Sequence, residues 1–350
     1  MRLLVFTQKV KADDPILGFM IGWLTALSKQ VETLEVICLE QGSYQLPPNV
    51  RVWSLGKESG QSRLKYLINF YRLIWRLRGN YQAVWVHMNQ IYVLLGFLPW
   101  RLWNKKISLW YAHGSVSWSL RLAEKMSDVI FTSSPSGFRL PSHKLQVVGQ
   151  GINTALFKKE GMVKEPGLLV HVGRISAIKH QKELIHALNL ISSLSWRLVF
   201  YGAPITPADH DYEMELKNLI LELGLSGRVT FAGPVAYQDL PACLFPAELF
   251  VTMSGTGSLD KAVLDAMAAG VIPVLAGETF KGVLGPLADR LTSSLGVTNF
   301  SEQIKSVLLA PPSEREELRS QVQTLVAEKY SLDGLMQKIV SHLNNVTPTH

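Results

Sequence analysis

The chain has 350 residues, of which 47% are hydrophobic and 18% charged, and its formal net charge is +7. This length predicts about two domains, each with enough apolar residues for a core. The two cysteines, Cys38 and Cys243, lie far apart, which argues against a disulfide framework and a zinc site and favours a reducing compartment. No run reaches the roughly 18 apolar residues of a transmembrane helix, and the first apolar run is too short for a signal peptide. We therefore expect a cytoplasmic protein.

The charge is unevenly distributed along the chain. Residues 1–150 hold 18 Lys and Arg against 8 Asp and Glu, whereas residues 151–350 hold 17 against 20. Within the basic half, stretches 63–81 and 91–106 combine basic and aromatic residues with apolar runs. This combination suits the headgroup region of an anionic membrane, so a membrane surface is a predicted partner. A core helix with a solvated basic face is the alternative, and nucleic acid is not expected because no nucleic-acid module is present.

Apolar periodicity in residues 1–150 alternates between strands and helices. We expect helices at 16–29 and 64–77, and strands at 2–7, 34–39, 50–53, 83–87, 107–112 and 129–133. Alternation with short connections predicts a parallel sheet covered by helices. A polar stretch at 147–166, followed by a new strand, predicts a domain boundary.

The second half repeats this rhythm. We expect strands at 168–172, 196–201, 229–231, 249–252 and 271–275, and helices at 179–194, 212–223, 237–244, 301–309, 312–329 and 332–343. Stretch 253–270 is a Gly/Ser/Thr loop that becomes a helix, with Ser258 as the expected N-cap, Asp260 in the first turn and Gly270 after the last turn. A strand, a glycine loop and a helix N-terminus together favour anion binding, although an ordinary βα turn is the alternative.

Residues at the ends of the expected strands are candidates for a binding site, because doubly wound sheets bind ligands at the carboxyl ends of their strands. Glycine recurs at these ends, as Gly173, Gly202 and Gly233. Arg174 and Lys179 follow the first strand of the second half. Two cations that converge on a helix N-terminus predict a site for a diphosphate.

Three segments of the second half resemble a known family: HVGRISAIKHQKELIHAL, VTFAGPV and LPACLFPAELFVTMSGTGSLDKAVLDAMAAGVIPVLAG. They are similar to the donor half of the family-four glycosyltransferases, which have two Rossmann-like domains (the GT-B fold). VVGQGINTALF resembles that family's connection between domains, and YAHGS resembles its N-domain histidine loop. The resemblance covers essentially the whole chain and is most specific in residues 147–276.

The resemblance implies an α/β fold with two Rossmann-like, doubly wound domains and a cleft between them. Residues 1–150 would bind the acceptor, residues 151–330 would bind the nucleotide-sugar, and residues 331–350 would form a helix that crosses back to the N-terminal domain. The implied activity is retaining hexosyl transfer from a nucleotide-sugar donor to a glycan or lipid-linked acceptor in cell-surface polysaccharide synthesis, with no cofactor and no metal. Such an enzyme would be cytoplasmic, or peripheral on the inner face of the plasma membrane.

The resemblance also implies roles for single residues. Arg174 and Lys179 match the basic pair on the donor diphosphate, where fixed cations stabilise the departing group. His113 matches the histidine near the transferred sugar, and Asp265 matches the carboxylate that holds the nucleotide ribose. The expected donor pocket comprises Gly173, Gly202, Ser254, Gly255, Thr256, Gly257, Ser258, Leu259, Asp260 and Asp265.

The chain departs from the family pattern at Gly257, eight positions before Asp265, where the family's first Glu usually stands. Either Asp260 substitutes for it near the donor sugar, or the Gly257 backbone and a water do. Asp265 is also one methylene shorter than the Glu usual there. These differences leave two alternatives open: a non-catalytic relative that binds a nucleotide-sugar or glycan, and, more distantly, a nucleotide-sugar epimerase on the same fold.

Three further groups carry weaker expectations. Asp209, His210 and Asp211 have metal-binding spacing but are predicted to lie on the surface. His87, at the end of a strand, either lines the acceptor site or packs in the core. Glu248, ahead of a strand, is expected to face solvent.

Overall fold

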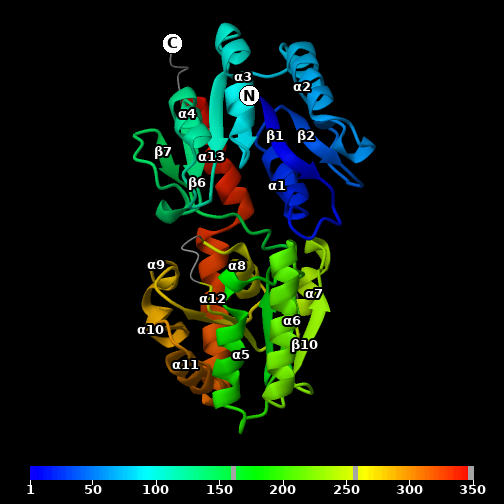
Figure 1. Ribbon diagram of the computed structural model, residues 1–350. Helices are drawn as coiled ribbons and strands as arrows, with labels where there is room; N and C mark the ends of the chain where they lie inside the picture. Colours follow the sequence, from blue (N-terminus) through cyan, green and yellow to red (C-terminus); the bar gives the residue numbers. More distant parts are fainter. Residues whose placement is uncertain (159–162, 255–258, 346–350) are drawn as a thin grey trace. The chain divides into compact units, whose positions relative to one another are not determined.

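The computed structural model describes residues 1–158, 163–254 and 259–345, which form two compact units (Figure 1). Unit 1 comprises residues 1–153, residues 236–238 and the described residues from Ser331 onward. Unit 2 comprises residues 154–235 and 239–330. Each unit is built on its own parallel sheet. No helix in the described ranges has both the length and the apolar character needed to cross a membrane.

The sheet of unit 1 has seven strands among the described residues, all parallel, in the order β3-β2-β1-β4-β5-β6-β7. Its inner strands are largely apolar because helices cover both faces, and all of β4 is buried. The sequence predicted every strand except β7, whose three residues are too few to show a pattern. The bounds are β1 (Arg2–Val10), β2 (Thr33–Gln41), β3 (Val50–Ser54), β4 (Ala83–His87), β5 (Lys106–Trp110), β6 (Val129–Thr132) and β7 (Leu145–Val147).

Two layers of helices enclose this sheet. One face packs against α1 (Phe19–Ser28) and α13 (Leu332–Asn345), and the other against α2 (Arg63–Leu77), α3 (Ile91–Leu102) and α4 (Trp118–Met126). Helix α1 begins three residues later than predicted, because the Asp14 side chain accepts hydrogen bonds from the backbone N–H groups of Ile16 and Leu17 and holds them in a turn. The sequence analysis did not assign α3 and α4 as helices. The stretch containing α3 was described as apolar, aromatic and basic, with a core helix only as the alternative to a membrane-surface segment.

The sheet of unit 2 has six parallel strands among the described residues, in the order β10-β9-β8-β11-β12-β13. Their bounds are β8 (Leu168–Val172), β9 (Arg197–Tyr201), β10 (Val229–Gly233), β11 (Leu249–Thr252), β12 (Ile272–Ala276) and β13 (Thr292–Ser293). The helices are α5 (Gln181–Leu190), α6 (Pro207–Glu222), α7 (Leu240–Leu244), α8 (Lys261–Ala268), α9 (Lys281–Leu284), α10 (Ala288–Leu291), α11 (Val297–Leu309) and α12 (Pro312–Lys329). Helix α5 packs beside α11, and α8 beside α12.

Both sheets reverse their strand order at one point. In unit 1 the reversal lies between β1 and β4, and in unit 2 it lies between β8 and β11. The loops after the two strands at such a reversal lead to helices on opposite faces, and ligands of doubly wound proteins bind there, beyond the carboxyl ends of the strands. In unit 2 these two loops are the ones that begin at Gly173 and at Met253. They contain most of the residues that the sequence analysis assigned to a donor pocket.

Candidate functional site

Helix α8 begins at Lys261, and Asp260 is its N-cap. The Asp260 backbone is extended, and its Oδ1 accepts a hydrogen bond from the Ala262 N–H at 3.1 Å. The prediction that Asp260 lies inside the first turn was therefore wrong, because this short carboxylate satisfies a helix-end N–H itself. Ser258, the expected cap, lies outside the described residues, and the N-cap is Asp260 instead. The helix ends before Gly270, whose φ of +67° suits glycine, as predicted.

An ion pair joins the two loops at the strand reversal of unit 2. Lys179 Nζ donates to Asp260 Oδ2 at 2.6 Å, and the side chains are 19% and 21% exposed. Burial acts to raise the pKa of Asp260. The Lys179 ammonium and the Ala262 N–H lower this pKa by more than burial raises it, so the pKa lies below its usual value. The sequence analysis placed both residues in one pocket but did not predict this ion pair.

The loop that carries Arg174 is anchored from beneath by buried polar side chains. Gln181 Nε2 donates to the Arg174 carbonyl at 2.9 Å and lies 3.4 Å from His171 Nε2. His171 Nδ1 is 3.0 Å from the Val251 carbonyl, which can only accept, so we assign the ring proton to Nδ1. Burial lowers the pKa of His171 to about 4, which keeps the ring neutral. Arg174 itself is exposed, with its Nε donating to the Ser176 hydroxyl at 3.3 Å.

Sequence reasoning missed His171 and Gln181. The one available signal was a polar residue inside the apolar strand LLVHV.

Two glycines bring this loop close to the end of the neighbouring strand β9. Gly202 has a φ of +152°, and a Cβ on it would lie 1.8 Å from the Gly173 carbonyl oxygen. Only a residue without a side chain fits there. A Cβ on Gly173 would lie 3.9 Å from Lys179 Cε, so Gly173 borders the ion pair. Gly173 and Gly202 are thus both at the carboxyl edge, beside Arg174 and Lys179.

Asp265 lies one turn into α8 and is buried. Both of its carboxylate oxygens accept from Lys261 Nζ, each at 2.8 Å. Burial lowers the pKa of Lys261 although the Asp265 charge opposes this shift. The sequence analysis singled out Asp265 but not the lysine that faces it.

Of the remaining predicted pocket residues, the structure describes the two that flank residues 255–258 in the sequence, Ser254 and Leu259. Ser254 donates its backbone N–H to the Thr252 hydroxyl at 3.2 Å, and within the described ranges its own buried hydroxyl has no hydrogen-bond partner. Leu259 is buried. The predictions for Gly255, Thr256, Gly257 and Ser258 fall outside the described residues.

In unit 1 the predicted histidine follows β5. His113 is exposed, and its Nδ1 accepts from the Ser115 N–H at 3.1 Å, so the proton of the neutral ring is on Nε2. His87 is instead buried among aromatic rings that include Trp23, Trp85 and Trp110. Burial lowers its pKa to about 3. Of the two readings open for His87, the structure selects the packed core residue.

The structure tests two further predictions of surface exposure, for residues 209–211 and for Glu248. The prediction that Asp209, His210 and Asp211 lie on the surface holds for the last two, but Asp209 is buried because it forms a capping box with Thr206 at the start of α6. Among the described residues, no group of three or more His, Cys, Asp and Glu side chains could hold a metal. The prediction that Glu248 faces solvent was wrong: it is buried, accepts from the Gly167 N–H at 2.6 Å and pairs with Arg315 at 2.6 Å. The position of Glu248 before a strand did not indicate that Arg315 and Arg319 of α12 would pack against it.

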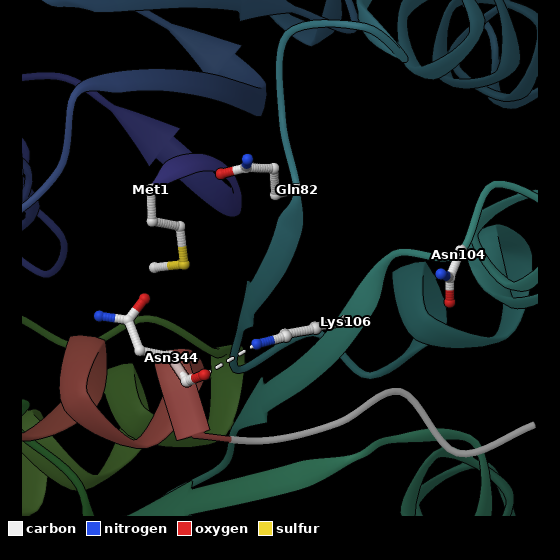
Figure 2. A pocket seen from close by; sticks show the side chains of 5 residues that line it. All are labelled: Met1, Gln82, Asn104, Lys106 and Asn344. Atoms are coloured by element: carbon white, nitrogen blue, oxygen red, sulfur yellow. Dashed lines mark hydrogen bonds between the residues drawn. The ribbon is translucent and has the colours of Figure 1, made fainter.

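A hollow also opens in unit 1, lined by Met1, Gln82, Asn104, Lys106 and Asn344 (Figure 2). Met1 and Gln82 precede β1 and β4, so the hollow lies at the amino edge of the sheet, away from the ends where doubly wound proteins bind ligands. The Lys106 ammonium donates to the carbonyl of Asn344 (Figure 2) and to that of Leu343, both in the last turn of α13. Its charge therefore caps a helix C-terminus.

Comparison with known proteins shows which families and folds this chain is similar to. Residues 153–324 match the family described as glycosyl transferases group 1. A GDP-mannose:cellobiosyl-diphosphopolyprenol alpha-mannosyltransferase of Xanthomonas campestris is 30% identical over 139 residues, which are 38% of this chain and 34% of that protein. A D-inositol 3-phosphate glycosyltransferase of Mycobacteroides abscessus is 26% identical over 162 residues, 46% of this chain and 35% of that protein. The chain thus spans about a third of the length of these curated relatives.

Solved structures extend the likeness to nearly the whole chain. Anabaena HepE in complex with UDP and glucose matches with a TM-score of 0.78 and 16% identity, over 99% of this chain and 100% of HepE. Sucrose-phosphate synthase from Thermosynechococcus elongatus matches with a TM-score of 0.74 and 14% identity, over 98% of each chain. The fold is therefore GT-B, with two Rossmann-like domains, as predicted. The segment that matches the glycosyl transferases group 1 family contains Arg174, Lys179, Asp260 and Asp265.

Proposed function

We propose that this protein is a glycosyltransferase that moves a sugar from a nucleotide-sugar donor to a glycan or lipid-linked acceptor in cell-surface polysaccharide synthesis. The observation that carries the proposal is the arrangement in unit 2. Arg174 and Lys179 follow β8, and Lys179 reaches Asp260 at the N-terminus of α8, beside the point where the strand order reverses. Cations at a helix N-terminus suit a donor diphosphate.

The relatives indicate which donors to test first. The named Xanthomonas relative uses GDP-mannose and acts on a lipid-linked sugar, and HepE has been solved with UDP-glucose. An acceptor of the lipid-linked kind would place this enzyme at the inner face of the plasma membrane as a peripheral protein.

The chemistry follows from the charges. As the bond between the sugar and the nucleoside diphosphate breaks, negative charge grows on the leaving phosphate. Arg174 and Lys179 would stabilise it without a metal. In a retaining transfer the same phosphate would accept the proton of the acceptor hydroxyl. The exposed Nε2–H of His113, in unit 1, would donate a hydrogen bond to the sugar.

A transfer assay with GDP-mannose and UDP-glucose tests the proposal. We expect Arg174→Ala and Lys179→Ala each to lower kcat by about 100-fold or more, as the loss of one transition-state donor does in other enzymes. Lys182→Ala is the matched control, because the Lys182 side chain on α5 is 44% exposed and pairs with Glu215. Equal loss in all three variants would contradict the assignment.

The alternative is a relative that binds a nucleotide-sugar or glycan without transferring it. Gly257 favours this reading, since it stands where the family usually has a glutamate. Tight donor binding, with no turnover on any donor and acceptor, would establish the alternative. Product analysis without an acceptor would reveal epimerisation.

A further inference from the structure

Helix α2 exposes an apolar stripe. Leu64, Ile68, Tyr71 and Trp75 are 67%, 50%, 42% and 59% exposed. Their spacing of four, three and four residues places them on one side of the helix. A different side of α2, with Phe70, Ile74 and Leu77, packs into the core of unit 1. The stripe is therefore not needed for packing, although leaving four large apolar side chains in water is unfavourable.

The stripe continues onto α3. The Tyr71 hydroxyl donates to the Leu95 carbonyl at 3.1 Å, and the rings of Trp75 and Trp103 lie 5.6 Å apart. On α3, Leu98 and Leu102 are 65% and 76% exposed, and they are one helical turn apart. Both helices cover the same face of the sheet in unit 1 (Figure 1). We name the six exposed residues the α2–α3 surface: Leu64, Ile68, Tyr71, Trp75, Leu98 and Leu102.

Basic residues border this surface. Lys65, Arg72 and Arg76 each follow a stripe residue by one position, which places them in a second row about 100° around α2. All three are exposed. Between Glu58 and Glu124 the sequence has nine Lys and Arg and no Asp or Glu. The α2–α3 surface thus combines apolar and aromatic side chains with positive charge that no acidic residue of that stretch offsets.

We infer that the α2–α3 surface docks on an anionic lipid bilayer, with α2 lying in the plane of the headgroups. The stripe enters the boundary between headgroups and acyl chains, the Trp75 and Tyr71 rings lie at headgroup level, and the basic row contacts lipid phosphates. Lys65, Arg72 and Arg76 can extend from the side of the helix to the phosphates while their methylene stems cover apolar surface. This docking requires neither a donor nor an acceptor, so it does not depend on the proposed transfer reaction.

A second copy of this chain and a nucleic acid would each fit the α2–α3 surface less well than an anionic bilayer. A second copy of this chain would bring two basic rows together, and like charges across an interface are unfavourable. Nucleic acid would pair with the row of cations but would leave the leucine and isoleucine side chains in water. An anionic bilayer matches both the charge and the apolar character.

Vesicle flotation with the full chain tests the inference. One set of vesicles is phosphatidylcholine alone, and the other contains 30% phosphatidylglycerol. We expect the anionic vesicles to bind at least tenfold more protein at low salt. Leu64→Gln/Ile68→Gln should lower binding to anionic vesicles at least tenfold. Arg72→Gln/Arg76→Gln should lower it about tenfold or more, because each basic residue near an anionic surface contributes about 1 kcal/mol.

The matched control is Leu190→Gln/Leu221→Gln, which replaces two leucines that are 57% and 67% exposed on helices of unit 2. It should bind like the unchanged protein. Leu98→Gln/Leu102→Gln provides a second test on a different helix, should the α2 variant fold poorly by circular dichroism.

Equal or negligible binding to both vesicle types would overturn the inference, and so would anionic binding that survives both apolar variants. Size-exclusion chromatography tests whether a second copy of this chain binds the surface instead. If the unchanged protein is a dimer that does not bind vesicles, and Leu64→Gln/Ile68→Gln is a monomer, the surface is a dimer interface. Failure of glycosyl transfer would leave these measurements unaffected.

Discussion

Replacing Asp260 by Asn removes the negative charge beside Lys179 and keeps an oxygen that can cap α8. In the structure Oδ2 accepts from Lys179 at 2.6 Å and Oδ1 accepts from the Ala262 N–H at 3.1 Å. Asn and Asp are equally good N-caps, so the helix should keep its start. A donor diphosphate would have to compete with Asp260 for the Lys179 ammonium. We therefore expect Asp260→Asn to bind nucleoside diphosphates more tightly than the unchanged protein.

The size of this effect follows from how exposed the ion pair is. A fully exposed pair contributes about 0.2–1 kcal/mol. The two side chains here are only about one-fifth exposed, so the upper end of that range applies. A difference of about 1 kcal/mol corresponds to about fivefold tighter binding. Asp260→Ala also loses the cap, so its free energy of unfolding should be lower by about a further 1 kcal/mol than that of Asp260→Asn.

Isothermal titration calorimetry with UDP and with GDP measures the binding, and thermal unfolding measures the cap. The gain in Asp260→Asn should shrink as salt is added, because salt screens partly exposed charges. If Asp260→Asn binds both diphosphates no more tightly than the unchanged protein, the reasoning is refuted. Turnover addresses a separate question: unchanged rate and donor preference in Asp260→Ala would show that Asp260 does not replace the glutamate absent at Gly257.

Two further predictions concern stability. Glu248→Ala should lower the free energy of unfolding by about 3–5 kcal/mol, because it leaves the Arg315 guanidinium without its buried partner at 2.6 Å, whereas the exposed Glu302→Ala should cost little in the same denaturant titration. A loss below 1 kcal/mol would contradict this. Burial lowers the pKa of His87 to about 3 and of His171 to about 4. Below pH 6.5 both histidines bind protons in the unfolded chain but stay neutral in the folded one. The free energy of unfolding therefore falls by up to about 1.4 kcal/mol per pH unit for each histidine as the pH drops. The contribution of His171 levels off near pH 4. His87→Phe should flatten the profile, and an unchanged slope would refute that account.

The sequence alone determined where most strands lie and which loops follow them. Buried parallel strands are largely apolar runs, so β4, β8 and β11 could be predicted directly from the sequence. Glycines and cations at the ends of such runs indicated the site, because the geometry of a doubly wound sheet makes those ends the binding edge. Arg174 and Lys179 were therefore predicted as binding residues before any contact between them and Asp260 was known.

The tertiary structure alone decided which of these side chains meet. Lys179 and Asp260 are 81 positions apart and form an ion pair only because β8 and β11 are neighbours in the sheet. The same adjacency brings His171 to the Val251 carbonyl. Glu248 is buried because α12 lays arginines over it. Local patterns report propensity and periodicity, whereas these contacts depend on strand order, which no short stretch of sequence contains.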